Sequence, residues 1–132
     1  ILIIYSLKKI LFTSFIYWES KLFLGLYKAR FMTKKKLGIL VNTDKHLKHL
    51  SGLCQAALSS DVEISLFIMD DGCSLIDTLN FKELCDADDI TATVCDHSYK
   101  EKGFTKDLVN IKAGSQFEHA IIANECDRYI VL

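Results

Sequence analysis

Short apolar runs alternate with helical patterns along the chain, and this alternation limits the possible folds more than any other feature. Four runs have the apolar, β-branched character of strands buried in a sheet. They are residues 37–41, 62–69, 90–95 and 128–132. Helical patterns are predicted over residues 46–59, 74–86 and 115–126. Strands that alternate with helices are joined by right-handed crossovers, which produce a parallel sheet with helices on both faces.

The predicted helices have recognisable start signals. Asn42-Thr43-Asp44 supplies turn and N-cap chemistry before the first helix. Ser74 or Asp77 is expected to cap the second helix. Ser115 and Glu118 have the spacing of a capping box. In this motif the Ser side chain accepts a hydrogen bond from a backbone amide at the helix start, and the Glu side chain accepts one from the backbone amide of the Ser. Two stretches remain: residues 96–103, predicted to be a loop or a short helical turn, and residues 106–112, which are not assigned.

Length and charge limit the number of domains and the class of partner. The chain has 132 residues, half of them hydrophobic, which is enough for one domain with a core and too little for two. Residues 1–31 contain five basic residues and one acidic residue, a net charge of +4, so residues 32–132 carry −5. An acidic domain without a basic stripe does not neutralise phosphates, so no nucleic-acid partner is expected.

Residues 1–31 differ from the rest of the chain in composition. Their longest uncharged run covers nine residues, 10–18, whereas a membrane-spanning helix needs about 20 apolar residues. No membrane span is therefore expected, and no cleavage site of a secretion signal is present. We expect residues 1–31 to be a non-domain segment outside the working protein, with a start at Met32 and one domain over residues 32–132. The alternative is a segment that lies on a membrane surface.

Five cysteines are present: Cys54, Cys73, Cys85, Cys95 and Cys126. Their number is odd and no two have C-x-x-C spacing, which favours reduced thiols in a cytoplasmic protein over a disulfide framework. Cys54, Cys85 and Cys126 lie in or beside predicted helices and are expected to be structural. Cys73 follows a strand at a position open to solvent exposure.

The distance between Cys73 and Cys95 depends on the order of the strands. In a flavodoxin-like order the first strand lies between the second and the third, so two strand spacings, about 10 Å, separate these cysteines. A disulfide needs Cα atoms within about 7 Å of each other. A direct bridge between the two is therefore not expected.

Polar clusters follow the predicted strands, and sites in parallel α/β sheets lie outside the carboxyl ends of strands. The clusters are Asn42-Thr43-Asp44, Asp70-Asp71-Gly72-Cys73 and Cys95-Asp96-His97-Ser98. Cys95 is the strongest candidate for chemistry, because cations such as His97 and Lys100 stabilise a nearby thiolate. The carboxylates of Asp96 and Glu101 disfavour a thiolate at Cys95. The alternative is a buried cysteine that packs as a small apolar residue.

No metal or cofactor is expected. Zinc needs four convergent ligands, and Cys95 with His97 supplies two. His46 and His49 lie three residues apart on one predicted helix face, which is more typical of a solvated surface. His119 is expected to be a surface residue or a hydrogen-bonded histidine. The sequence contains no phosphate-loop, dinucleotide-binding or serine-hydrolase motif.

Several segments resemble DsrE/DsrF-like proteins, and the similarity covers about residues 36–132. The segments are Leu37-Gly38-Ile39-Leu40, residues 64–72, Cys95-Asp96-His97-Ser98, Gly103-Phe104, Gly114-Ser115-Gln116-Phe117 and residues 125–131. Members of this family often have a cysteine after a strand, a downstream glycine, and a Gly-Ser pair that opens a helix. They also often have an acidic residue before a last apolar strand.

The resemblance implies a three-layer α/β fold, which we expect as a flavodoxin-like, mostly parallel sheet with helices on both faces. It also implies a homo-oligomer and a role in intracellular sulfur transfer between donor and acceptor proteins. In sulfur-relay members, the cysteine that matches Cys95 accepts sulfur as a persulfide and passes it on. Those members commonly carry basic or small residues after the cysteine, and Asp96 departs from that pattern.

The expected function is that of a cytoplasmic, sulfurtransferase-like carrier that holds sulfane sulfur on Cys95 without a cofactor. His97 is expected to stabilise the persulfide anion. The predicted pocket is lined by Asn42, Asp71, Lys100 and Ser115. Ser115 contributes through a helix N-terminus, which favours anions. The alternative function is a non-catalytic module of the same fold, which binds a small anion or a partner while Cys95 only packs.

Overall fold

The chain folds around a parallel β-sheet in a computed structural model that describes residues 33–132. The expectations for residues 1–31 lie outside the described residues. The strands are β1 (Lys35–Val41), β2 (Val62–Ile68), β3 (Ile90–Cys95), β4 (Ile111–Gly114) and β5 (Arg128–Val131). Their order in the sheet is β4-β3-β2-β1-β5, and every neighbouring pair is parallel.

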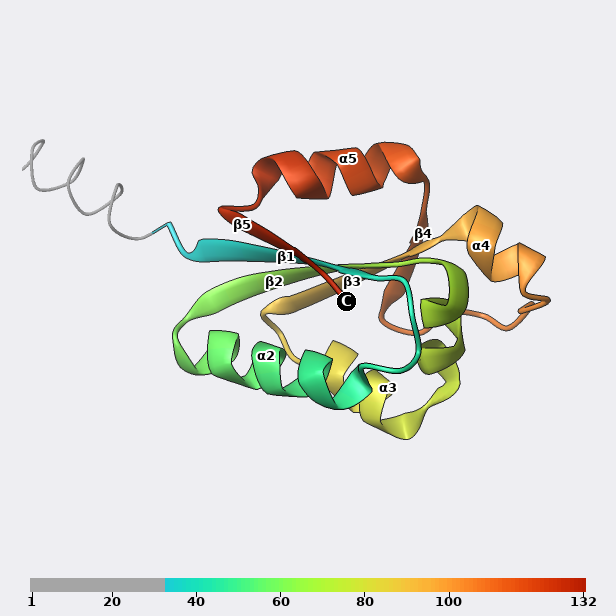
Figure 1. The fold of residues 1–132 in the computed structure, drawn as a ribbon, viewed down its shortest axis with the longest axis horizontal. Helices are drawn as coiled ribbons and strands as arrows, with labels where there is room; N and C mark the ends of the chain where they lie inside the picture. The colour runs from blue at the N-terminus through green and yellow to red at the C-terminus, as the bar shows by residue number, and fades with distance from the viewer. Residues whose placement is uncertain (1–32) are drawn as a thin grey trace, which may run out of the picture. The chain divides into compact units, whose positions relative to one another are not determined.

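Helices cover both faces of this sheet. The helices are α2 (Leu47–Ser59), the 3-10 helix η1 (Asp70–Asp77), α3 (Leu79–Cys85), α4 (Asp96–Glu101) and α5 (Gln116–Glu125). Figure 1 shows α2 and α3 on one side of the sheet and α5 on the other. The predicted three-layer, parallel α/β fold with helices on both faces is confirmed. None of the helices between residues 33 and 132 has the length and apolar character needed to cross a bilayer.

The main core lies between the sheet and the layer of α2 and α3. Successive strand residues point to opposite faces, so alternate residues such as Ile39, Ile64 and Leu66 turn to this layer and are fully buried. Leu50 of α2 and Phe81 of α3 pack against them. The helix predicted over residues 46–59 is confirmed, and it begins at Leu47.

The opposite layer is thinner and more polar. No residue of α5 is buried, and the side chain of Phe117 is 72 % exposed. The fully buried ring of Phe67 on β2 stacks against His119 of α5, with 4.7 Å between the ring centroids. On this face an imidazole packs against the sheet, whereas on the α2 and α3 face the sheet is covered by apolar side chains.

The segment after β2 differs from the single helix predicted over residues 74–86. It forms η1 and α3, and the N-cap of α3 is Thr78 rather than Ser74 or Asp77. Asp70 has a φ of 50°, so the chain turns sharply at the end of β2. Gly72 is then packed so closely that a Cβ there would lie 2.3 Å from the carbonyl oxygen of Val41.

Two further helix and strand boundaries differ from the prediction. Helix α2 begins at Leu47 with His46 as its N-cap and no side-chain cap bond, so Asn42-Thr43-Asp44 does not cap it. Strand β4 was not predicted, and it begins at Ile111 inside the unassigned stretch.

The strand order changes the spatial relation of Cys73 and Cys95. Strand β2 lies between β1 and β3, so the order assumed for the 10 Å separation was wrong. Cys73 follows β2 and Cys95 ends the adjacent β3. The prediction that Cys73 is open to solvent is also wrong, because its side chain is fully buried within η1.

Candidate functional site

Cys95 lies where three elements meet at the carboxyl end of the sheet. It is the last residue of β3 and the N-cap residue of α4, and it pairs with Gly114 at the end of β4. Helix α5 begins two residues after Gly114. The Cys95 sulfur accepts a hydrogen bond from Gln116 Nε2 at 3.8 Å. Because Cys95 is 4 % exposed and Gln116 is exposed, a surface side chain lies against the buried sulfur.

Ser115 holds the start of α5 through the predicted capping box, which is confirmed. Its Oγ accepts a hydrogen bond from the Phe117 amide at 3.2 Å, and Glu118 Oε2 accepts one from the Ser115 amide at 2.6 Å. The Ser115 hydroxyl and amide lower the pKa of the Glu118 carboxyl. The Ser115 hydroxyl is thus engaged in the cap, and the cap places Gln116 beside Cys95.

Gln116 is the first member of a polar chain across the α5 face. Gln116 Oε1 lies 3.0 Å from His119 Nδ1, and His119 Nε2 lies 2.6 Å from Tyr129 Oη. The expectation that His119 is hydrogen-bonded is confirmed. Sequence reasoning missed Gln116 and Tyr129 as site residues. The spacing of three between Gln116 and His119 was an available signal, because residues three apart lie on one helix face.

The basic side chains that the sequence places near Cys95 lie against carboxylates on α4. His97 Nε2 lies 3.7 Å from Glu101 Oε2, and the His97 side chain is 86 % exposed. Lys100 Nζ lies 2.6 Å from Asp96 Oδ2. Both pairs join residues four apart, one turn along the helix. The predicted roles of His97 and Lys100 at the sulfur therefore stay predictions.

Cys73 and Asp71 approach the site from η1. Burial, with a smaller contribution from negative charge on Cys95, raises the pKa of the Cys73 thiol to about 11, so the two thiols lie near each other. Asp71 pairs with Lys102, and the Lys102 ammonium lowers the pKa of its carboxyl. Asp71 thus links η1 to the residue after α4.

Asn42 lies apart from the other predicted site residues. It is exposed after β1, and its backbone N–H donates to the Leu132 carbonyl at 2.9 Å. Strand β1 is two strands from β3, a separation of about 10 Å. The structure therefore brings Ser115 close to Cys95 and places Asn42 at a separate hollow beside β5.

The remaining thiols have structural surroundings. Burial raises the pKa of Cys54 to about 11 and that of Cys85 to about 12, and both side chains belong to the core. Cys126 is half-buried, and burial raises its pKa as well. The expectation that Cys54 and Cys85 are structural is confirmed. Cys126 is the most exposed of the five thiols, whereas Cys95 is buried.

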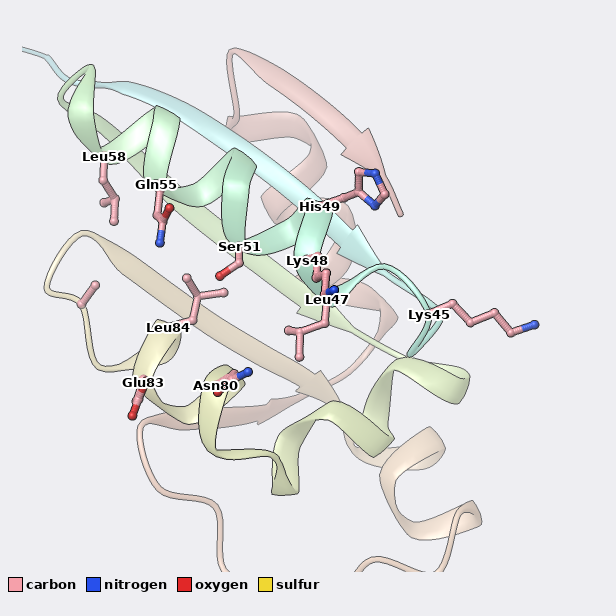
Figure 2. Close-up of a pocket in the computed structure, with 11 residues that line it drawn as sticks. Lys45, Leu47, Lys48, His49, Ser51, Gln55, Leu58, Asn80, Glu83 and Leu84 are labelled. Carbon is pink, nitrogen blue, oxygen red and sulfur yellow. The ribbon is translucent and has the colours of Figure 1, made fainter.

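A groove on the other side of the sheet does not include Cys95. Figure 2 shows this groove between α2 and α3, with Leu47, Leu58 and Leu84 among the side chains that line it. Its polar side chains include Ser51 and Gln55. Because α2 and α3 cover the face opposite α5 (Figure 1), this groove is separate from the thiol. Within residues 33–132, no group of three or more potential ligand side chains is placed to hold a metal ion.

Comparison with known proteins adds no family. The sequence matches no protein-family model and no curated protein. The resemblance to DsrE/DsrF-like proteins therefore stays a prediction. What the geometry offers chemically is a thiol with a neighbouring amide donor at the carboxyl edge of a parallel sheet, an arrangement suited to an anionic sulfur species.

Proposed function

We propose that this chain carries sulfane sulfur as a persulfide on Cys95 and passes it between thiols, as a sulfurtransferase-like relay. The observation that carries this proposal is the hydrogen bond from Gln116 Nε2 to the Cys95 sulfur. An N–H group directed at sulfur stabilises its anionic form, and both a thiolate and a persulfide are anions at sulfur. A cysteine that only packs does not need a polar donor.

The position of Cys95 supports the same function. Sites in parallel α/β sheets lie at the carboxyl ends of strands, and Cys95 ends β3. The first turn of α5 lies next to the sulfur through Gln116. The positive end of a helix dipole favours a nearby anion. These contributions act on the sulfur from the same side as the amide of Gln116.

The proposed reaction is a balanced thiol exchange. The Cys95 thiolate attacks the outer sulfur of a donor persulfide, R–S–SH, and forms a new S–S bond. The S–S bond of the donor breaks, and the donor leaves as the thiolate R–S⁻, so charge and atoms balance. An acceptor thiolate then attacks the outer sulfur on Cys95 and restores the Cys95 thiolate. Neither step consumes an oxidant or a reductant.

Access to the sulfur requires a small movement of α5. Gln116, Ser115 and Phe117 are exposed, and no residue of α5 is buried. Helix ends with few buried contacts open at low free energy. We propose that the first turn of α5 opens to admit the donor and then returns the Gln116 amide to the sulfur.

The cellular setting is part of the proposal. Donor and acceptor are proteins with reactive thiols, and the reducing cytoplasm suits five free cysteines. We also propose a homo-oligomer, in which a second copy covers the exposed side chain of Ile121, which lies beyond the first turn of α5. A monomer in sedimentation equilibrium at all protein concentrations would remove the oligomer from the proposal.

Sulfur loading tests the role of Cys95. The full chain is incubated with polysulfide, and its intact mass is measured before and after dithiothreitol. We expect the wild type to gain a reducible sulfur atom and the Cys95→Ser variant to gain none. An equal gain in the wild type and in Cys95→Ser would refute the assignment.

Cys126→Ser is the matched control for unspecific sulfur uptake. Cys126 is more exposed than Cys95, so uptake governed by exposure alone would occur at Cys126. We expect Cys126→Ser to gain sulfur like the wild type. Loss of the gain in Cys126→Ser with retention in Cys95→Ser would transfer the carrier role to Cys126.

A further inference from the structure

The polar chain behind Cys95 has a defined direction. Gln116 Oε1 accepts hydrogen bonds only, so His119 Nδ1, 3.0 Å away, must carry a proton. A neutral imidazole that is protonated at Nδ1 accepts a hydrogen bond at Nε2. The hydroxyl of Tyr129, 2.6 Å from Nε2, is therefore the donor there. Each donor in the chain points toward the sulfur.

The surroundings of His119 hold its ring in place. The ring stacks on the fully buried ring of Phe67 with an interplanar angle of 17°, and it also contacts the ring of Tyr129. Burial raises the pKa of the Tyr129 phenol, so the hydroxyl stays protonated and can donate a hydrogen bond. Gln116 and His119 lie on one face of α5, three residues apart. The imidazole thus connects Tyr129 with the amide that faces Cys95.

We propose that His119 and Tyr129 are positioning residues that hold the Gln116 amide with its NH₂ group, rather than its oxygen, toward the Cys95 sulfur. This inference rests on the proposed function. Tyr129 lies on β5, three strands from β3 and about 14 Å away, so it acts through His119 and Gln116. The amide nitrogen stabilises an anionic sulfur, whereas the amide oxygen repels it.

Loss of the Tyr129 hydroxyl has a specific consequence under this proposal. In Tyr129→Phe, Nε2 of His119 loses its donor, and the imidazole proton moves to Nε2, where water accepts its hydrogen bond. Nδ1 then becomes an acceptor, and the Gln116 amide rotates so that its NH₂ group faces the imidazole. Its oxygen then faces the Cys95 sulfur, which disfavours the thiolate and the persulfide.

Two measurements on the full chain test this arrangement. Ring ¹⁵N shifts show which nitrogen of each histidine carries the proton, and the His119→Asn variant identifies the His119 signals by removing them. We expect the Nδ1–H form in the wild type and the Nε2–H form in Tyr129→Phe. Sulfur loading of Tyr129→Phe should be about tenfold to a hundredfold slower, the range for one lost hydrogen bond to a charged group.

Two controls separate positioning from general damage. Tyr99→Phe removes the hydroxyl of a buried tyrosine outside the polar chain, whose partner is the Lys106 carbonyl, and should leave the loading rate unchanged. His119→Asn retains a donor near the position of Nδ1 but has no tautomer to select. In that background, Tyr129→Phe should change the loading rate by less than about twofold, because the coupling between the two sites has been removed.

The outcomes distinguish this inference from the function on which it rests. An Nε2–H form of His119 in the wild type, or normal loading by Tyr129→Phe, overturns the positioning role and leaves the carrier function standing. A wild type that takes up no sulfur removes the carrier function and the positioning role together. Equal slowing of Tyr129→Phe in the presence and absence of His119 also overturns the inference.

Discussion

Two glycines show how much one residue can constrain this fold. A Cβ at Gly72 would lie 2.3 Å from the carbonyl oxygen of Val41, whereas a Cβ at Gly52 would have nothing within 4 Å. Gly72 is therefore required by a close approach between η1 and the end of β1. Gly52 is an exposed residue in the middle of α2, where glycine only weakens the helix.

The same substitution should have opposite effects at the two positions. Gly72→Ala should destabilise the fold by about 1–3 kcal/mol, because backbone must shift to admit the methyl group. Gly52→Ala should stabilise it by about 0.5–1 kcal/mol, the difference in helix propensity between glycine and alanine. Denaturant unfolding of both variants measures these changes. A Gly72→Ala variant as stable as Gly52→Ala would contradict the close packing of η1.

At the residue scale, the sequence could place Cys95 at the end of a strand but could not predict the surroundings of its thiol. The end of a strand is a local property of the sequence. The partners of the Cys95 sulfur depend on contacts between residues far apart in sequence: Gln116 is 21 residues from Cys95, and Tyr129 is 10 from His119. Residue type and local spacing do not predict such contacts. His97 and Lys100 are near Cys95 in sequence, but their side chains pair with carboxylates of α4.

At the element scale, the strength of each local signal decided what could be predicted. Strands β1 to β3 have several buried apolar residues each, so their patterns are clear. Strand β4 was missed because it is a four-residue edge strand in which Ile111 alone is buried. The break between η1 and α3 was missed because it lies at Thr78, where the backbone is extended and no glycine or proline in the sequence indicates a helix end.

The capping box of α5 leads to a prediction about stability. Ser115→Ala removes the hydroxyl that accepts a hydrogen bond from the Phe117 backbone amide. Loss of such a cap lowers the free energy of unfolding by about 1 kcal/mol. Ser59→Ala is the control, because the Ser59 hydroxyl donates to a carbonyl at the exposed end of α2 and caps no amide. Unfolding by urea at neutral pH should show a loss for Ser115→Ala and almost none for Ser59→Ala.

The cap should also make this loss depend on pH. The pKa of Glu118 is lowered in the folded protein by its hydrogen bonds with Ser115. Its stabilisation is therefore present above the ordinary Glu pKa and is lost as the pH falls through the lowered folded value. The difference between the wild type and Ser115→Ala should accordingly shrink in acid. A difference that stays constant from neutral to strongly acidic pH would contradict the ionised capping box.

At the scale of the whole molecule, the two sides of the sheet differ in composition. The α2 and α3 side contains the buried apolar core, and the α5 side contains the polar chain that leads to Cys95. The three-layer form could be predicted because helix and strand patterns alternate. The strand order could not, because right-handed crossovers determine the face on which each helix packs but leave several orders possible.

The buried thiols predict how the stability of the whole domain depends on alkaline pH. The pKa values of Cys54 and Cys73 are raised to about 11 and that of Cys85 to about 12, from an ordinary value of 9.0. The unfolded chain loses these protons first as the pH rises. The free energy of unfolding should therefore be fully retained below about pH 9 and fall between pH 9 and 11 or 12.

Chemical denaturation from pH 7 to pH 11 measures this fall, and Cys85→Ala is the matched variant. Cys85→Ala should be less stable than the wild type at neutral pH, because it leaves a cavity in the core. Its stability should also fall less steeply above pH 9, since it has lost a buried thiol. Equal slopes for both proteins would contradict the proposed origin of the alkaline loss.

The location of the added sulfur shows whether Cys95 is the carrier thiol. The full chain is loaded with polysulfide, its persulfides are capped by alkylation, and peptide masses are compared with and without prior addition of glutathione. We expect one added sulfur on the peptide that contains Cys95, which glutathione removes as glutathione persulfide. Sulfur on the Cys126 peptide instead, or sulfur on Cys95 that glutathione cannot remove, would contradict a relay at Cys95.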